Sequence, residues 1–180
     1  MLQRILPVLL CIISLTSSAQ VSLPETETIT WSASRKLKWS DYKASPNPDS
    51  DAAASTTTYL SIEYAIRPNS FSFRIRSLFA MNESWGRHKD AYILSHEQGH
   101  FDIAEIFARK LNKRMSEYKF NPRSYQRDLK RIYEQVTRET EDLQNLYDKE
   151  TNHSINKAKQ AEWLLRIEAM LEEWEAWANY

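Results

Sequence analysis

The residues best suited to chemistry form the pattern His96-Glu97-x-x-His100, near the middle of the chain. On an α-helix, residues four positions apart lie about one turn above each other, so the two imidazoles face the same way. Two such histidines can bind one zinc ion. Glu97 flanks the pair and can accept a proton from water at the metal. Together these residues indicate a hydrolytic zinc site.

Gly99 lies inside the same helical stretch. Glycine in a helix interior costs about 1 kcal/mol relative to alanine, so it usually has a packing or site-related reason. An amphipathic helix that carries two histidines by chance has no need of this glycine. We therefore favour metal binding by His96 and His100 over that alternative.

A catalytic zinc site usually has three protein ligands and one open position. Asp102 and Glu105 follow on the same helix but point away from the histidine pair, and His88 lies about 12 Å before His96 along the axis. The third ligand is therefore expected from another segment. The best candidate is His153, at a predicted break between helices. The alternatives are glutamates on the intervening segment: Glu134, Glu139, Glu141 and Glu150.

Tyr147 lies about one and a half helical turns before His153. Its hydroxyl could donate a hydrogen bond to an oxyanion that develops during hydrolysis, which would make it a catalytic residue beside Glu97. The alternative interpretation is a tyrosine of the hydrophobic core.

The elements that must position these residues follow from hydrophobic periodicity. Residues 57–66 and 71–80 alternate polar and apolar side chains around a short polar loop, which predicts an antiparallel hairpin. Shorter strands are expected at 28–31 and 37–39. The period then changes to 3.6, which predicts helices at about 89–118, 123–148 and 155–177. A break is expected at 151–154.

The last predicted helix carries an apolar stripe at three- and four-residue spacing: Trp163, Ile167, Leu171, Trp174 and Ala178. Such a stripe is typical of a helix packed on a core. A helix lying on a membrane surface is the alternative, but those helices favour Lys and Arg on the polar face, and this polar face is acidic. We interpret the stripe as packing.

Residues 1–19 have the pattern of a secretory signal peptide, with Arg4, an apolar run and a small-residue cleavage site at Ala19. The run is too short to span a bilayer. Residues 20–180 would then form one secreted domain, periplasmic or extracellular, without stable membrane insertion. The only cysteine, Cys11, would be removed, leaving no disulfide. The near-neutral charge indicates no nucleic-acid partner.

Three segments also carry a resemblance to a known family. Residues 37–43 are similar to an L-T-W-x-D-F-K motif, residues 96–105 contain the histidine pattern, and residues 147–153 are similar to Y-D-x-x-T-x-H-G, with Ser154 in place of the glycine. The chain resembles a bacterial family of uncharacterised proteins labelled predicted secreted zinc-dependent proteases. The resemblance covers most of residues 20–180 and favours His153 as the third ligand.

These observations predict an α+β, zincin-like domain with a small antiparallel sheet packed against a long active-site helix and two further helices. The expected function is zinc-dependent hydrolysis of a peptide or protein substrate, which could pair with an exposed edge strand. Two alternatives remain: a zinc hydrolase of another amide, such as one in cell-wall material, and a non-catalytic zinc-holding or interaction module. An open coordination position beside Glu97 would separate the enzymes from the module.

Overall fold

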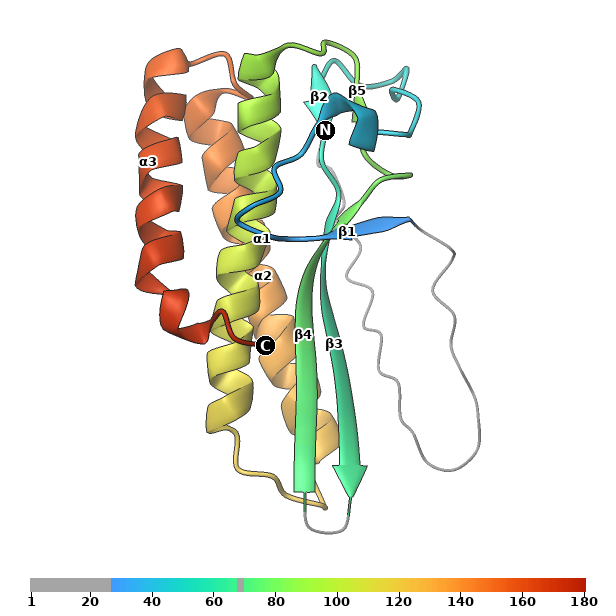
Figure 1. Cartoon of the computed structure of the whole chain (residues 1–180), viewed down its shortest axis with the longest axis vertical. Helices are drawn as coiled ribbons and strands as arrows, with labels where there is room; N and C mark the ends of the chain where they lie inside the picture. The colour runs from blue at the N-terminus through green and yellow to red at the C-terminus, as the bar shows by residue number, and fades with distance from the viewer. Residues whose placement is uncertain (1–26, 68–69) are drawn as a thin grey trace.

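The computed structural model describes residues 27–67 and 70–180, so the predicted signal peptide at 1–19 lies outside the described residues. Strands and helices are separated along the chain: all the described strands come first, and the three long helices follow (Figure 1). The strands are β1 (Thr28–Thr30), β2 (Ala54–Ser55), β3 (Thr58–Arg67), β4 (Ser70–Ala80) and β5 (Trp85–Gly86). The helices are α1 (Ala91–Glu117), α2 (Tyr125–Thr151) and α3 (Lys157–Glu173), with short 3-10 helices at Trp39–Asp41 and Glu175–Trp177.

Helix α1 is the central element of the fold. It packs against β3 and β4 with one part of its surface and against α2 and α3 with another (Figure 1). Asp90 begins the helix by accepting a hydrogen bond from the Ile93 amide, at 2.8 Å, which satisfies one of the free N–H groups of the first turn. Ile103, Phe107 and Leu111 are buried below the histidine pair, as their spacing predicts.

The two alternating runs form the predicted hairpin. Strands β3 and β4 pair antiparallel, with Ile62 opposite Ile75, and β1 pairs with the other edge of β4. Leu60, Ile62 and Tyr64 are buried on the face that covers the helices. The sheet order is therefore β1-β4-β3, and a separate pair of short strands, β2 and β5, lies near the start of α1.

The predicted strand at residues 37–39 is wrong. Instead, Trp39–Asp41 form a 3-10 helix, because Asp41 closes a tight turn on Lys38: its amide donates to the Lys38 carbonyl and its carboxylate accepts from the Lys38 amide. The Trp39 ring packs on Gly86, where an added Cβ would come within 2.6 Å of the ring. Alternation over three residues is too short to distinguish a strand from this turn.

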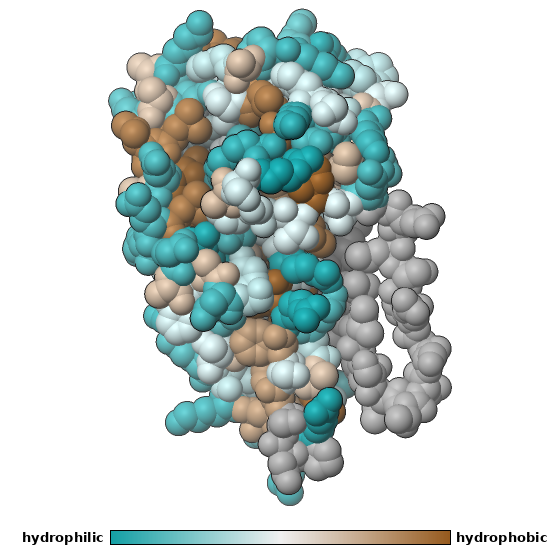
Figure 2. All heavy atoms as spheres, in the orientation of Figure 1, coloured by the Kyte–Doolittle hydropathy of each residue, from teal (hydrophilic) through white to brown (hydrophobic). Residues whose placement is uncertain are grey.

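The second and third predicted helices are present. Helix α2 ends three residues later than predicted, whereas α3 begins two residues later and ends four residues earlier than the predicted 155–177. The end of α2 is a left-handed turn at residues 152–154. Trp163 and Ile167 of the α3 stripe are buried in the main core, which confirms its packing role. Figure 2 shows the hydrophobic residues on the visible face gathered mainly over α3. No helix within residues 27–67 and 70–180 is long and apolar enough to cross a membrane.

The fold is thus α+β, with a small antiparallel sheet and three helices. Its main core lies between the β3–β4 hairpin and the helices. A second hydrophobic cluster joins the N-terminal segment to the upper part of α1 and to β4, and it contains Leu37, Tyr42, Phe79, Met81 and Phe101. The histidine pattern of α1 faces α2 on one side. On the other side it faces the described residues before β3, which we call the N-terminal region.

Candidate metal centre

Three side chains from two helices converge at one point. His96 and His100 come from α1, as their spacing predicts, and Asp148 comes from α2. The Asp148 Oδ1 atom lies 3.1 Å from the Nε2 atom of each histidine. The two Nε2 atoms are 3.2 Å apart. The three atoms therefore form a nearly equilateral triangle.

This triangle has the dimensions of a zinc site. Ligand atoms about 2.0–2.1 Å from a tetrahedral zinc ion are about 3.3 Å from one another. Imidazole nitrogens that carry no hydrogen and a carboxylate oxygen all present lone pairs, so these three atoms can lie this close only with a cation or a hydrogen between them. Within residues 27–67 and 70–180, this is the one group of three or more His, Cys, Asp and Glu side chains close enough to hold a metal.

A glutamine on α2 orients His100. Its Oε1 atom lies 2.5 Å from His100 Nδ1, and its Nε2 donates to the His100 backbone carbonyl at 2.9 Å. Because the amide nitrogen donates to the carbonyl, Gln144 Oε1 must accept a hydrogen bond from the Nδ1–H group of His100. The His100 Nε2 atom then faces the triangle with its lone pair, as a metal ligand requires.

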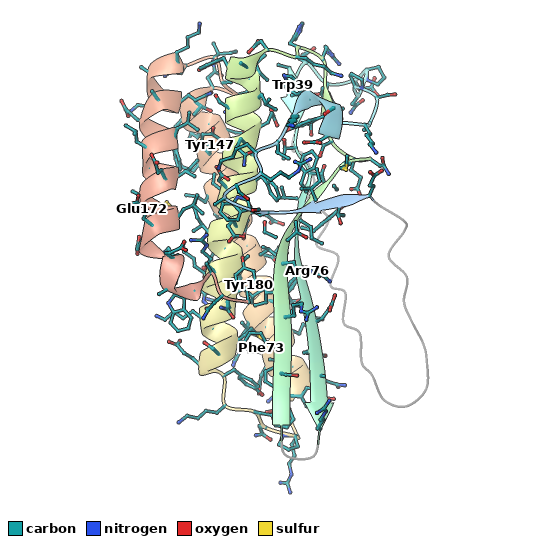
Figure 3. All side chains as sticks on the ribbon, viewed as in Figure 1. Trp39, Phe73, Arg76, Tyr147, Glu172 and Tyr180 are labelled. Carbon is teal, nitrogen blue, oxygen red and sulfur yellow. The ribbon has the colours of Figure 1, made fainter. Side chains whose placement is uncertain are left out.

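Tyr147 packs against the imidazole rings of both His96 and His100. Its side chain is fully buried, its ring stacks on His96 at 4.5 Å and meets His100 edge-on at 5.1 Å. Figure 3 shows Tyr147 beside the upper half of α1. A Cβ added at Gly99 would lie 2.6 Å from the tyrosine hydroxyl, so the glycine allows this close approach. Among the described residues His96 Nδ1 has no hydrogen-bond partner, so stacking on Tyr147 and the contact of Nε2 with Asp148 orient that ring.

The Tyr147 hydroxyl donates to the His96 backbone carbonyl at 3.3 Å. Burial raises the pKa of this phenol above its usual value, so the group keeps its proton. The structure thus places Tyr147 against α1, next to the candidate metal-binding triangle. Its predicted role as an oxyanion donor stays a prediction.

The pKa shifts of His96, His100 and Asp148 are those expected of three groups placed to share one positive charge. Burial lowers the pKa of His96 to about 4. Burial also opposes protonation of His100, but the Asp148 charge outweighs it and raises the pKa of His100 to about 9. Asp148 itself is partly buried, yet the two histidines hold its pKa well below the usual range. The negative charge of Asp148 therefore favours a positive charge at the triangle.

Glu97 lies on the opposite flank and is held by the N-terminal region. Its Oε2 atom accepts a hydrogen bond of 2.6 Å from Thr56, just before β3. The Tyr42 hydroxyl lies 2.8 Å from the same threonine oxygen. Because the threonine has one hydroxyl proton and donates it to Glu97, Tyr42 must donate to Thr56. The order of donation is Tyr42 to Thr56 to Glu97.

The Glu97 carboxylate is suited to accept a proton. Its side chain is buried beside the triangle, and this burial raises its pKa, although the positive charge of His100 and the Thr56 hydrogen bond oppose the increase. The charge of Asp148 raises it further. A carboxylate with a raised pKa is a stronger base than an exposed one.

His153 lies next to the triangle but outside it. Its Nδ1 atom is 3.6 Å from Asp148 Oδ1, and its side chain is 71% exposed. The same Asp148 oxygen lies 3.1 Å from His96 Nε2. The separation between His153 Nδ1 and His96 Nε2 therefore cannot exceed the sum of these two distances. The predicted role of His153 as a metal ligand stays a prediction, and Asp148 lies in the position expected of a third ligand.

The acidic alternatives to His153 lie elsewhere in the structure. Glu139 pairs with Arg114, and Glu150 accepts a hydrogen bond from Trp163. The two acids excluded by helical geometry also have other partners: Trp31 donates to Asp102, and Arg109 and Tyr180 donate to Glu105. None of the acids considered from the sequence belongs to the three-residue group, including Glu134 and Glu141.

Sequence reasoning missed Asp148, Gln144 and Thr56. One signal could have pointed to Gln144 and to the part of α2 that carries Asp148. The buried face of α2 begins with apolar residues and then becomes polar, in the order Leu129, Tyr133, Val136, Thr140, Gln144, Tyr147 and Thr151. A core-facing stripe that becomes polar indicates that the helix there lines a site instead of a hydrophobic core.

Comparisons with known proteins give one match. No curated protein and no solved structure matches the chain. A family model described as "bacterial protein of unknown function (DUF922)" matches residues 14–154, which includes the histidine pair, Glu97, Asp148 and His153. The matched segment covers most of the chain, which therefore belongs to the DUF922 family of bacterial proteins.

Proposed function

We propose that this protein is a secreted zinc-dependent hydrolase of the H-E-x-x-H type, acting on peptide bonds. The observation that supports it most is the triangle of His96, His100 and Asp148, with its 3.1–3.2 Å edges, beside the buried carboxylate of Glu97. Two nitrogens and one carboxylate oxygen are a common ligand set of catalytic zinc. Such a set leaves a coordination position open.

The residues divide into two roles. His96, His100 and Asp148 would hold zinc, which when bound polarises a carbonyl and lowers the pKa of water. Glu97 acts as general base and then as general acid, because its raised pKa suits both transfers. Thr56 fixes one oxygen of the Glu97 carboxylate and so directs the other.

The sheet offers a place for an extended substrate. Strand β3 lies at an edge of the described three-stranded sheet, and Thr56 precedes it by two residues. A peptide that pairs with the start of this edge would pass close to Glu97. Such an arrangement of sheet edge, active-site helix and metal is what we mean by a zincin-like domain.

The test combines metal analysis with a broad peptide-library digest of residues 20–180. We expect one zinc per chain, and no zinc after the double substitution His96→Ala and His100→Ala. Glu97→Gln should retain zinc but reduce hydrolysis about 100-fold or more, as expected when a positioned general base is removed. Stoichiometric zinc in the double variant would refute the metal centre. Unchanged turnover in Glu97→Gln would refute the mechanism.

A second function has one observation in its favour. His153 lies close enough to Asp148 to add a fourth protein donor, and four protein donors are typical of structural zinc sites. A non-catalytic zinc-holding module would bind the metal with His153 permanently in place. It would release no products from the library, and Glu97→Gln would then change nothing measurable.

A further inference from the structure

The turn after α2 holds an unusual backbone conformation. Asn152, His153 and Ser154 have positive φ angles of 49°, 51° and 73°. Residues with a Cβ adopt this left-handed conformation at a steric cost, and they usually do so as single residues. Three such residues in succession are therefore rare. Backbone strain of this kind persists only where surrounding contacts enforce it, and it occurs most often at functional sites.

The surrounding contacts are present on both sides of the turn. The His153 amide donates to the Asp148 carbonyl at 2.9 Å, and the Tyr92 hydroxyl donates to the Ser154 carbonyl at 2.8 Å. Tyr92 lies on α1, one turn before His96. The backbone of His153 is therefore fixed relative to both helices that supply the metal-binding triangle.

The His153 imidazole, in contrast, is held loosely. Its Nδ1 atom is 3.6 Å from Asp148 Oδ1, too far for a hydrogen bond, and most of the side chain is exposed. The separation is close to the roughly 3.3 Å expected between two ligands of one zinc ion. His153 nevertheless lies outside the group whose ligand atoms are all within 4.8 Å of one another. The ring borders the triangle without completing it.

We propose that His153 is an exchangeable fourth metal donor, which closes the open coordination position in the resting protein and leaves it when substrate binds. The proposal rests on the proposed function, because it assumes a metal on His96, His100 and Asp148. The strained backbone keeps the imidazole beside the metal, and the exposed side chain leaves it free to rotate. Substrate must then compete with His153 for the metal.

Cobalt(II) in place of zinc provides a test without an activity assay, because its visible spectrum reports the number and type of donors. The variant is His153→Asn, since asparagine tolerates left-handed backbone. The matched control is His88→Asn, which removes an exposed histidine outside the triangle. We expect His153→Asn to weaken zinc binding at least about 10-fold, the scale on which even outer partners of a metal act.

The cobalt spectrum of His153→Asn should differ from that of the wild type, and added imidazole should restore it. His88→Asn should behave as the wild type in both measurements. Unchanged affinity and spectrum in His153→Asn would overturn the proposal. Weaker binding with an unchanged spectrum would also overturn it, because His153 would then act only through Asp148.

Two further measurements keep the outcomes distinct. If His153→Asn fails to fold, as judged by circular dichroism, His153→Gly replaces it, because glycine adopts positive φ freely. The double substitution His96→Ala and His100→Ala tests the metal centre itself. Zinc retained in that variant refutes the proposed function and this inference together. Zinc lost there but unaffected by His153→Asn and His153→Gly refutes this inference alone.

Discussion

The two flanks of the histidine pattern on α1 are supported by different parts of the chain. On one flank, α2 provides Asp148 and Gln144, which bond the rings of His96 and His100. On the other flank, the N-terminal region provides Thr56 to hold Glu97. One flank therefore organises the candidate metal ligands and the other organises Glu97, the proposed base.

The supports also differ in their chemistry. The α2 flank uses a charge and an amide that both raise the pKa of His100. The N-terminal flank uses two hydroxyls and a small aromatic cluster, in which Tyr42 packs against Trp39 and Phe79. For the proposed hydrolase, this difference predicts that metal affinity and turnover can be altered separately, by substitutions on opposite sides of the same helix.

The largest effect is expected from Asp148→Asn. Asparagine keeps the shape of the side chain but removes the negative charge that faces both histidines, so zinc affinity should fall about 100-fold or more, beyond the loss typical of outer partners. The zinc affinity is measured by competition with a chromophoric chelator. The control is Asp142→Asn, an exposed carboxylate on the same helix. Equal zinc affinity in both variants would remove Asp148 from the ligand set.

A paired substitution tests the separation of the flanks. Gln144→Leu frees His100 Nδ1 from its partner and should weaken zinc binding roughly 10- to 100-fold. Thr56→Val removes the hydroxyl that holds Glu97 and should leave zinc affinity unchanged, while kcat falls about 10-fold, the value of one hydrogen bond to a charged group.

The controls for this pair are Gln126→Leu, which removes an exposed amide of α2, and Thr56→Ser, which keeps the hydroxyl. Zinc affinity and kcat per bound zinc are measured for all four variants. If Thr56→Val weakens zinc as much as Gln144→Leu does, the two flanks are not independent and the comparison above is wrong.

The smallest effect concerns the stability of the N-terminal region at acid pH. Burial by itself raises the pKa of Asp41, but the Arg35 guanidinium, at 2.8 and 3.0 Å, and the Lys38 amide bind the ionised carboxylate and bring its pKa below 3.8. A carboxyl group whose pKa is lower in the folded state stabilises the fold above its unfolded pKa. That contribution is lost as the pH falls through the folded pKa.

Asp41→Asn should therefore lower the free energy of unfolding by about 1 kcal/mol or less at neutral pH, since Arg35 is partly exposed and solvent screens the pair. The difference from wild type should be full above about pH 3.8, the unfolded value, and should shrink below it as the pH falls through the lower folded pKa. Urea denaturation at several pH values measures this, with Asp49→Asn as an exposed control. A difference that grows as the pH falls would contradict the assignment.

The sequence by itself determined whatever depends on local periodicity. Four-residue spacing places His96 and His100 on one face of α1, and the alternation of 57–66 and 71–80 produces the β3–β4 hairpin. The same reasoning excluded Asp102 and Glu105, because a helix fixes the direction of each side chain relative to its neighbours. Only the short run at 37–39 misled, since three residues are too few to define a period.

Only the tertiary structure decided which distant side chains complete the site. Asp148 is 52 residues from His96, and Thr56 is 41 residues from Glu97. Their contacts depend on how α2 and the N-terminal region pack on α1, which no local pattern specifies. A shift of α2 by one turn, about 5.4 Å along its axis, would replace Asp148 with another side chain. The histidine pair is thus a property of one helix, whereas the candidate metal centre is a property of the packing between helices.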